Sequence, residues 1–138
     1  MFKNKKLKKD LINIFMCGIF FYSGKYLKNK NLNEKFNKIR HRGPDNSTNI
    51  IISMKDNDLY LGFHRLSING LNNESNQPLV DDKVYLICNG EIFNYKKLIN
   101  EYEIKNYKTG SDCEIIIHLY KKLGFNKMIK KLDGEFAF

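Results

Sequence analysis

The sequence predicts an α+β fold whose strands are mostly antiparallel. Strand-like segments follow one another across short polar turns, which favours antiparallel pairing. Helical segments are grouped between sets of strands instead of alternating with them. Neither a GxGxxG sequence nor a phosphate-binding loop is present. The expected order is therefore a strand, a helix, three strands, three helices and a final strand.

The first two predicted elements are a strand and a helix. Residues 17–22 (CGIFFY) predict a buried strand, because aromatic and branched side chains dominate. Residues 31–40 predict a helix, because apolar residues recur at positions i, i+4 and i+7 and so share one face. The sequence HRGPD at 41–45 ends this helix, because a proline disfavours the helical conformation in the residue before it.

A β-hairpin is predicted next. Residues 48–54 and 58–68 have the composition of strands, and Lys55–Asn57 forms the turn between them. In the second strand the apolar residues Leu59, Leu61 and Phe63 alternate, which predicts one buried face.

The second half of the chain is predicted to hold the remaining strands and helices. Ser111 and Glu114 form an S-x-x-E capping box ahead of a helix. In order, the predicted elements are a polar loop at 70–78, a strand at 83–89 that Gly90 ends, a short helix capped by Asn94, a helix at 115–123, a helical segment at 128–132 and a strand at 134–138.

The composition is that of one globular domain with a basic charge. The 138 residues are 42% hydrophobic and 28% charged, with a net charge of +9. Lysine supplies 21 of the 24 basic residues and Ala137 is the single alanine, a bias typical of an A/T-rich coding genome. Nucleic-acid-binding motifs are absent, so no nucleic-acid partner is expected. No run of 18 apolar residues occurs, so no membrane span is expected either.

Cysteine usage and the N-terminal sequence predict a cytoplasmic location. Three cysteines without CxxC spacing indicate a reducing compartment rather than a disulfide framework. Residues 1–22 imitate a signal peptide, but Asn13 interrupts the apolar run and no small-x-small cleavage site follows. A targeting or membrane-surface role for residues 1–16 is the alternative.

Cys17 is the candidate nucleophile. A thiol is reactive as the thiolate and titrates near ~8.5, so it needs a base. The α-amino group of the same residue, with a pKa of about 8, serves as that base when the cysteine is the first residue of the mature chain. Alternatively, Cys17 is a buried strand residue or pairs with a histidine. A metal site is not expected, because no two of the candidate ligands have ligand-pair spacing; they are Cys17, Cys88, Cys113, His41, His64 and His118.

Six short motifs follow one another along the chain. They are MCGIF at 16–20, HRGPD at 41–45, RLSI at 65–68, NQP at 76–78, NGEIFN at 89–94 and TGSDCE at 109–114. With these motifs the chain resembles the glutaminase domain of class II glutamine amidotransferases, and specifically of the glutamine-hydrolysing asparagine synthetases. The resemblance runs from residue 17 to residue 138. It implies a partial four-layer αββα N-terminal-nucleophile hydrolase sandwich.

The resemblance also implies roles for individual residues. Cys17 attacks the side-chain carboxamide of glutamine with its own amino group as the base, and Asn89 and Gly90 form the oxyanion hole. Arg65 receives the α-carboxylate of glutamine, and Glu91 and Asp112 receive its α-ammonium. The implied glutamine-binding residues are Arg65, Leu66, Ser67, Ile68, Asn69, Asn89, Gly90, Glu91 and Asp112.

Each of these residues also has a simpler interpretation. Arg65 would make a surface ion pair, and Asp112 would favour the dipole of a helix from its first turn. Asn89 and Glu91 would be turn residues.

Two departures from the family pattern shape the expectations. Residues 1–16 precede the nucleophile, as a misassigned start or a propeptide, and while they remain attached the nitrogen of Cys17 is an amide. The domain at 17–138 is expected to be C-terminally incomplete and therefore marginally stable or prone to aggregation.

The partners follow from the same resemblance. They are L-glutamine and a synthetase domain or subunit supplied elsewhere, with a homodimer as one assembly considered. No cofactor is expected for this domain itself; ATP and magnesium are implied for the synthetase domain, which is expected to be absent here. The alternative to a glutaminase is an inactive remnant or a glutamine-binding module.

Overall fold

The computed structural model describes residues 16–25 and 31–138. The predicted N-terminal extension lies outside the described residues except for Met16. Within them the fold is α+β and every paired set of strands is antiparallel, as the sequence predicts. No helix in the described ranges is long and apolar enough to cross a membrane.

The first half of the chain forms a three-stranded sheet in the order β1-β3-β2. Its strands are β1 (Gly18–Gly24), β2 (Asn46–Ser53) and β3 (Asp58–Arg65). This confirms the predicted strand and hairpin, but the predicted burial of the first strand is wrong, because β1 lies at an edge of the sheet and its Phe21 is 60% exposed. However, β3 ends at Arg65, whereas the prediction continued to residue 68. The amides of Leu66 and Ser67 bind the thiol of Cys17 and the carboxylate of Asp45 instead of a neighbouring strand.

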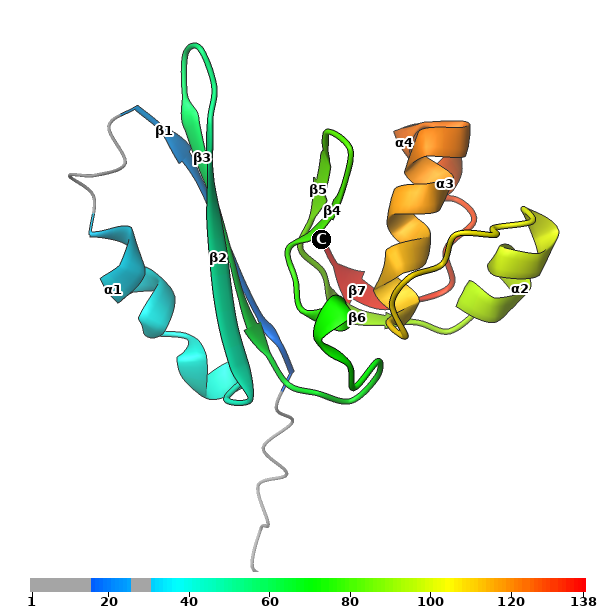
Figure 1. Cartoon of the computed structure of the whole chain (residues 1–138), viewed down its shortest axis with the longest axis horizontal. Helices are drawn as coiled ribbons and strands as arrows, with labels where there is room; N and C mark the ends of the chain where they lie inside the picture. Colours follow the sequence, from blue (N-terminus) through cyan, green and yellow to red (C-terminus); the bar gives the residue numbers. More distant parts are fainter. Residues whose placement is uncertain (1–15, 26–30) are drawn as a thin grey trace, which may run out of the picture.

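The central strand β3 is buried on both faces. On one face lies α1 (Leu32–Asn37), whose Phe36 packs on Tyr60 (Figure 1). On the other face, Leu61 and Phe63 pack with Ile87 from the second half of the chain. The alternation in the sequence therefore identified one of two buried faces. The helix α1 covers one face of β3 and strands of the second half cover the other, so β3 is buried from Tyr60 to Arg65.

The helix before HRGPD is shorter than predicted. It ends at Asn37, and a 3-10 turn (Arg40–Arg42) follows. Gly43 then passes against the end of β3 so closely that a Cβ atom would lie 2.2 Å from the carbonyl oxygen of His64. The close approach, rather than an unusual φ angle, requires glycine here.

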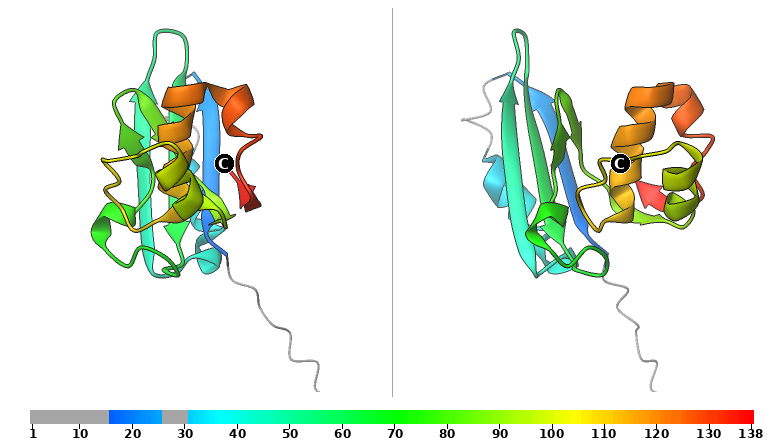
Figure 2. Two further views of the ribbon diagram at one scale, coloured as in Figure 1. Left: turned by 90° about the vertical axis from the view of Figure 1, so that its right-hand side faces the viewer. Right: turned by 45° about the vertical axis from the view of Figure 1, so that its right-hand side comes forward.

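The second half contains four short strands and three helices. The hairpin β4 (Leu79–Asp81) with β5 (Val84–Leu86) and the pair β6 (Asn89–Ile92) with β7 (Gly134–Ala137) lie between the three-stranded sheet and the helices (Figure 1, Figure 2). The helices are α2 (Tyr95–Glu101), α3 (Ile115–Leu123) and α4 (Phe125–Met128). Their apolar faces form the largest core, which includes Ile115 and Leu119.

The predicted strand at 83–89 is wrong in its extent, and β4 was not predicted. The segment is divided into β5 and β6, and Gly90 lies inside β6 instead of ending a strand. The break falls at Cys88, whose backbone N–H and C=O both bind the side chain of Gln77. A residue whose two backbone groups are taken by a side chain has none left for a strand ladder.

The predicted helix caps are partly wrong. Ser111 accepts from Cys113 N, but the Glu114 carboxylate binds the amides of Lys108 and Thr109 rather than that of Ser111. Asn94 occupies the N-cap position of α2 without a capping bond. Its side chain instead binds the backbone at 131 and 133, just ahead of β7. These side chains connect separate segments, which local sequence patterns do not report.

Candidate functional site

A cavity of about 250 Å³ opens where β1, the end of β3, β6 and the 3-10 turn Asp112–Glu114 meet. Nine of the ten predicted site residues line it, and Ser67 is not among them. All three cysteines of the chain line it as well. The nine are Cys17, Arg65, Leu66, Ile68, Asn69, Asn89, Gly90, Glu91 and Asp112.

Cys17 stands at the start of β1 and faces the turn that follows β3. Its Sγ accepts from Leu66 N at 3.3 Å and donates to Leu66 O at 3.5 Å. Burial raises the pKa of the Cys17 thiol, and the backbone of Leu66 and the charge of Arg65 oppose that rise. At neutral pH the thiol is therefore protonated, and a reaction through its sulfur needs a base.

The HRGPD motif binds the backbone of Cys17 and the backbone of the turn after β3, a role that was not predicted from the sequence. Arg42 Nε donates to the carbonyl of Cys17 at 3.3 Å. Asp45 Oδ2 accepts from Ser67 N at 2.7 Å, and its own N–H donates to the carbonyl of Arg65 at 3.0 Å. Ser67 thus contributes a backbone amide behind the cavity wall. The motif itself was visible in the sequence, but its partners are distant along the chain.

Arg65 is buried and does not form the surface ion pair considered as an alternative. Its Nη1 donates to Asn72 O at 3.0 Å and to Asn76 Oδ1 at 2.6 Å. Its Nη2 donates to Asn69 O at 3.4 Å and to Gly70 O. The guanidinium therefore folds the loop 69–76 around itself. A ligand carboxylate reaches the Nη donors only by replacing some of these acceptors.

The two acidic residues differ in their surroundings. Asp112 is 4% exposed and its Oδ2 accepts from Ile92 N at 2.6 Å, which ties the 3-10 turn to β6. It stands in a first turn, as the simpler interpretation expected, but its carboxylate binds another strand. Glu91 is exposed on β6, opposite Glu135 of β7. The cavity thus has one fixed buried carboxylate, and Glu91 and Glu135 are exposed at its rim.

Asn89 and Gly90 begin β6. Gly90 has a φ of 149°, and a Cβ atom there would lie 2.2 Å from Glu135 O. Glycine is required because β7 passes so close. Both residues belong to a strand rather than a turn, so the turn interpretation of Asn89 is wrong.

No histidine among the described residues lines the cavity that holds the Cys17 thiol. His64 is fully buried, with its Nδ1 2.7 Å from Ser47 Oγ and its Nε2 3.0 Å from Phe36 O. His118 binds the Glu114 carboxylate. Both rings are thus engaged with other groups. No cluster of three or more His, Cys, Asp or Glu side chains among residues 16–25 and 31–138 has the arrangement of a metal site.

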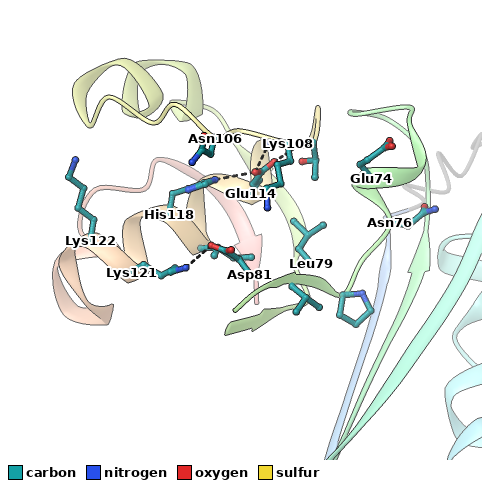
Figure 3. Close-up of a pocket in the computed structure, with 14 residues that line it drawn as sticks. Glu74, Asn76, Leu79, Asp81, Asn106, Lys108, Glu114, His118, Lys121 and Lys122 are labelled. Carbon is teal, nitrogen blue, oxygen red and sulfur yellow. Dashed lines mark hydrogen bonds and ion pairs between the residues drawn. The ribbon is translucent and has the colours of Figure 1, made fainter. Parts of the chain in front are cut away.

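A second, larger cavity of about 720 Å³ lies between β4, the loop before the 3-10 turn and α3 (Figure 3). The Glu114 carboxylate lies at its wall and accepts from Lys108 N at 2.8 Å, Thr109 N at 2.6 Å and His118 Nε2 at 3.1 Å. No residue predicted for the site lines this cavity.

Comparison with known proteins identifies related sequences over nearly the whole chain. The glutamine amidotransferase domain family matches residues 16–138. A probable asparagine synthetase [glutamine-hydrolyzing] of Acanthamoeba polyphaga mimivirus is 36% identical over 126 residues, covering 88% of this chain and 23% of that protein. Asparagine synthetase [glutamine-hydrolyzing] 2 of Arabidopsis thaliana is 39% identical over 129 residues, covering 89% of this chain and 21% of that protein.

A probable asparagine synthetase [glutamine-hydrolyzing] of Dictyostelium discoideum is likewise 39% identical, over 132 residues, covering 89% of this chain and 23% of that protein. The chain thus spans between about a fifth and a quarter of the length of these relatives.

Proposed function

Because this chain belongs to the glutamine amidotransferase domain family, we propose that its smaller cavity binds L-glutamine and hydrolyses it to glutamate and ammonia through a thioester on Cys17. One observation carries the proposal. Nine residues that are scattered between positions 17 and 112 converge on one cavity with the thiol at its wall. A buried strand residue without a function would not need these neighbours.

The chemistry begins with the loss of the thiol proton. The α-amino group of Cys17 is the proposed base, because its pKa of about 8 suits proton transfer near neutral pH. The thiolate attacks the amide carbon of glutamine, and the C–N bond breaks as the amine returns the proton to the departing ammonia. Water then cleaves the thioester to glutamate. This scheme requires a mature chain that begins at Cys17.

The negative oxygen of the tetrahedral intermediate needs fixed donors. The side-chain amide of Asn89 and the backbone N–H of Gly90 are proposed for that role, and one such donor is typically worth about 3 kcal/mol of barrier. Arg65 is proposed to bind the α-carboxylate in place of loop carbonyls, while Asp112 and Glu91 bind the α-ammonium. Ammonia released in this way would supply an ATP-dependent and magnesium-dependent synthetase domain that converts aspartate to asparagine.

The arrangement of elements supports the proposed fold. Figure 1 shows α1, the three-stranded sheet, the strands β4–β7 and the helices α2–α4 in succession. We propose that this succession is part of a four-layer αββα sandwich of the N-terminal-nucleophile type.

The alternative is a glutamine-binding module without turnover. It is favoured by the raised pKa of the Cys17 thiol, which leaves the sulfur unreactive when no free amine is present.

The test compares ammonia release from three proteins: one that begins at Cys17, the chain from Met1, and Cys17→Ala. We expect glutamine hydrolysis from the first and none from Cys17→Ala. An intact mass of the protein from its native source shows where the mature chain begins. Hydrolysis that survives Cys17→Ala would end the thioester proposal, and glutamine binding without hydrolysis in all three would favour the binding module.

A further inference from the structure

The NQP motif at 76–78 has no role in the chemistry above, yet it lies between the two cavities. Alternate residues of this segment face opposite ways. Glu74, Asn76 and Pro78 line the larger cavity (Figure 3), while Ser75 and Gln77 line the smaller one. The segment is thus a shared wall.

Gln77 binds the backbone of the residue that precedes Asn89. Its Nε2 donates to Cys88 O at 3.0 Å, and its Oε1 accepts from Cys88 N at 2.5 Å. Gln77 is 4% exposed and Cys88 is 1% exposed, so neither group has water as a substitute partner. One amide side chain therefore sets where the chain leaves β5 and where Asn89 and Gly90 begin β6.

Asn76 binds Arg65, which lines the smaller cavity. Its Oδ1 accepts from Arg65 Nη1 at 2.6 Å, the shorter of the two contacts of that nitrogen. The segment itself is anchored to the three-stranded sheet, because Thr48 Oγ1 donates to Gln77 O. Adjacent residues on one anchored segment thus hold two groups that the proposed reaction uses for different steps.

We propose that Asn76 and Gln77 are positioning residues: Gln77 places the oxyanion donors of Asn89 and Gly90, and Asn76 places the guanidinium of Arg65. This inference rests on the proposed glutaminase function. It predicts that substitutions of the two residues change different kinetic constants. Loss of Gln77 impairs stabilisation of the intermediate and lowers kcat, whereas loss of Asn76 impairs glutamine binding and raises KM.

The chemistry of the Gln77 contact specifies its test. The side chain must donate and accept at once, and an ionised glutamate accepts only. Gln77→Glu therefore keeps the shape and loses the bond to Cys88 O at neutral pH. A protonated carboxylic acid again donates and accepts, and burial raises the pKa of a carboxyl group. The ratio of variant to wild-type kcat should consequently rise as the pH falls.

The experiment measures kcat and KM for glutamine in proteins that begin at Cys17. We expect Gln77→Glu to lower kcat about tenfold to a hundredfold at pH 8 with KM within about threefold, and to recover toward acid pH. Asn76→Leu should raise KM about tenfold or more with a nearly unchanged kcat, and Asn76→Asp, which keeps the acceptor, should restore KM. Glu74→Gln, an exposed residue of the same segment, is the matched control.

A loss shared equally between kcat and KM in both variants, or a kcat ratio that is independent of pH, would overturn the positioning roles. Amide hydrogen exchange at residues 88–91 reads the Gln77 contact without turnover. Faster exchange of the Cys88 N–H in Gln77→Met, which lacks the oxygen that accepts from it, supports the contact, and unchanged exchange overturns it. Gln77→Glu keeps that acceptor and serves as the comparison. If the wild-type protein hydrolyses no glutamine, the proposed function fails while the exchange measurement still decides the contact.

Discussion

The three-stranded sheet and the short strands β4–β7 hold their backbones in different ways. In the order β1-β3-β2, strands of 7 or 8 residues pair with one another over their full length. In the second region the strands have 3 or 4 residues. Side chains also bind the backbone there, as Gln77 does at Cys88 between β5 and β6 and Asp112 does at Ile92, the last residue of β6.

This difference explains where the cavity lies. A continuous ladder uses its backbone groups internally and presents side chains alone. Where the strands are short, backbone amides and small residues reach a cavity, as Gly90 does from the second position of β6. The regular sheet therefore supplies the support, and the region of short strands supplies the proposed site.

The largest expected effect is a loss of stability at the three-stranded sheet. Gly43→Ala places a Cβ atom 2.2 Å from His64 O at the end of β3, so backbone must move. We expect the free energy of unfolding to fall by about 2–4 kcal/mol, measured by denaturant unfolding. Gly124→Ala is the control, because nothing lies within 4 Å there and only its φ of 75° is unfavourable. With a ψ of 165° this is a conformation that glycine alone adopts readily, so the expected cost is about 1–3 kcal/mol from the backbone conformation without a clash. Equal losses would contradict the packing argument.

The next largest effect is expected at Arg65 and the loop 69–76. Arg65→Lys replaces a planar fork that reaches four acceptors with one ammonium group. Losing these charge-assisted bonds to partly buried acceptors should lower the free energy of unfolding by about 1–3 kcal/mol. Arg40→Lys, at an exposed arginine, should change it by less than about 0.5 kcal/mol. If both substitutions cost the same, the guanidinium does not organise the loop 69–76.

A smaller and pH-dependent effect is expected at Glu114. Burial raises the pKa of this carboxyl group, but bonds from Lys108, Thr109 and His118 together lower it below its usual value. The ionised form is therefore favoured by folding, and its contribution is present above the usual glutamate pKa and lost as the pH falls through the folded pKa. Glu114→Gln should cost about 1–2 kcal/mol at pH 7 and little at strongly acid pH. A cost that is independent of pH would show that charge plays no part.

The smallest expected effect is a difference in the alkylation rates of the three cysteine thiols. Cys17 is partly exposed, whereas Cys88 and Cys113 are buried, so peptide mapping should find iodoacetamide on Cys17 first. Because burial raises the pKa of the Cys17 thiol, its alkylation rate should rise with pH along a curve displaced to higher pH than in the urea-unfolded chain. Coincident curves would mean that the folded site does not bury the sulfur.

Local patterns predicted the elements well where one segment carries its own signal. The strand after Cys17, the hairpin at its Lys55–Asn57 turn, the helix at 115–123 and the final strand are all present. Three of the failures share one cause. The end of β3, the break at Cys88 and the partner of Glu114 are each set by a group elsewhere in the chain that binds a backbone amide.

The sequence by itself determined the α+β class, the grouping of helices between sets of strands and the family, because periodicity and short motifs are local properties. It also named the residues of the proposed site through that resemblance. Only the tertiary structure decided what holds them: Arg42 and Asp45 behind the Cys17 contact, Asn76 on Arg65, and Gln77 on Cys88. Hydrogen bonds between distant segments depend on where both partners lie in space, and no local pattern in either segment specifies that.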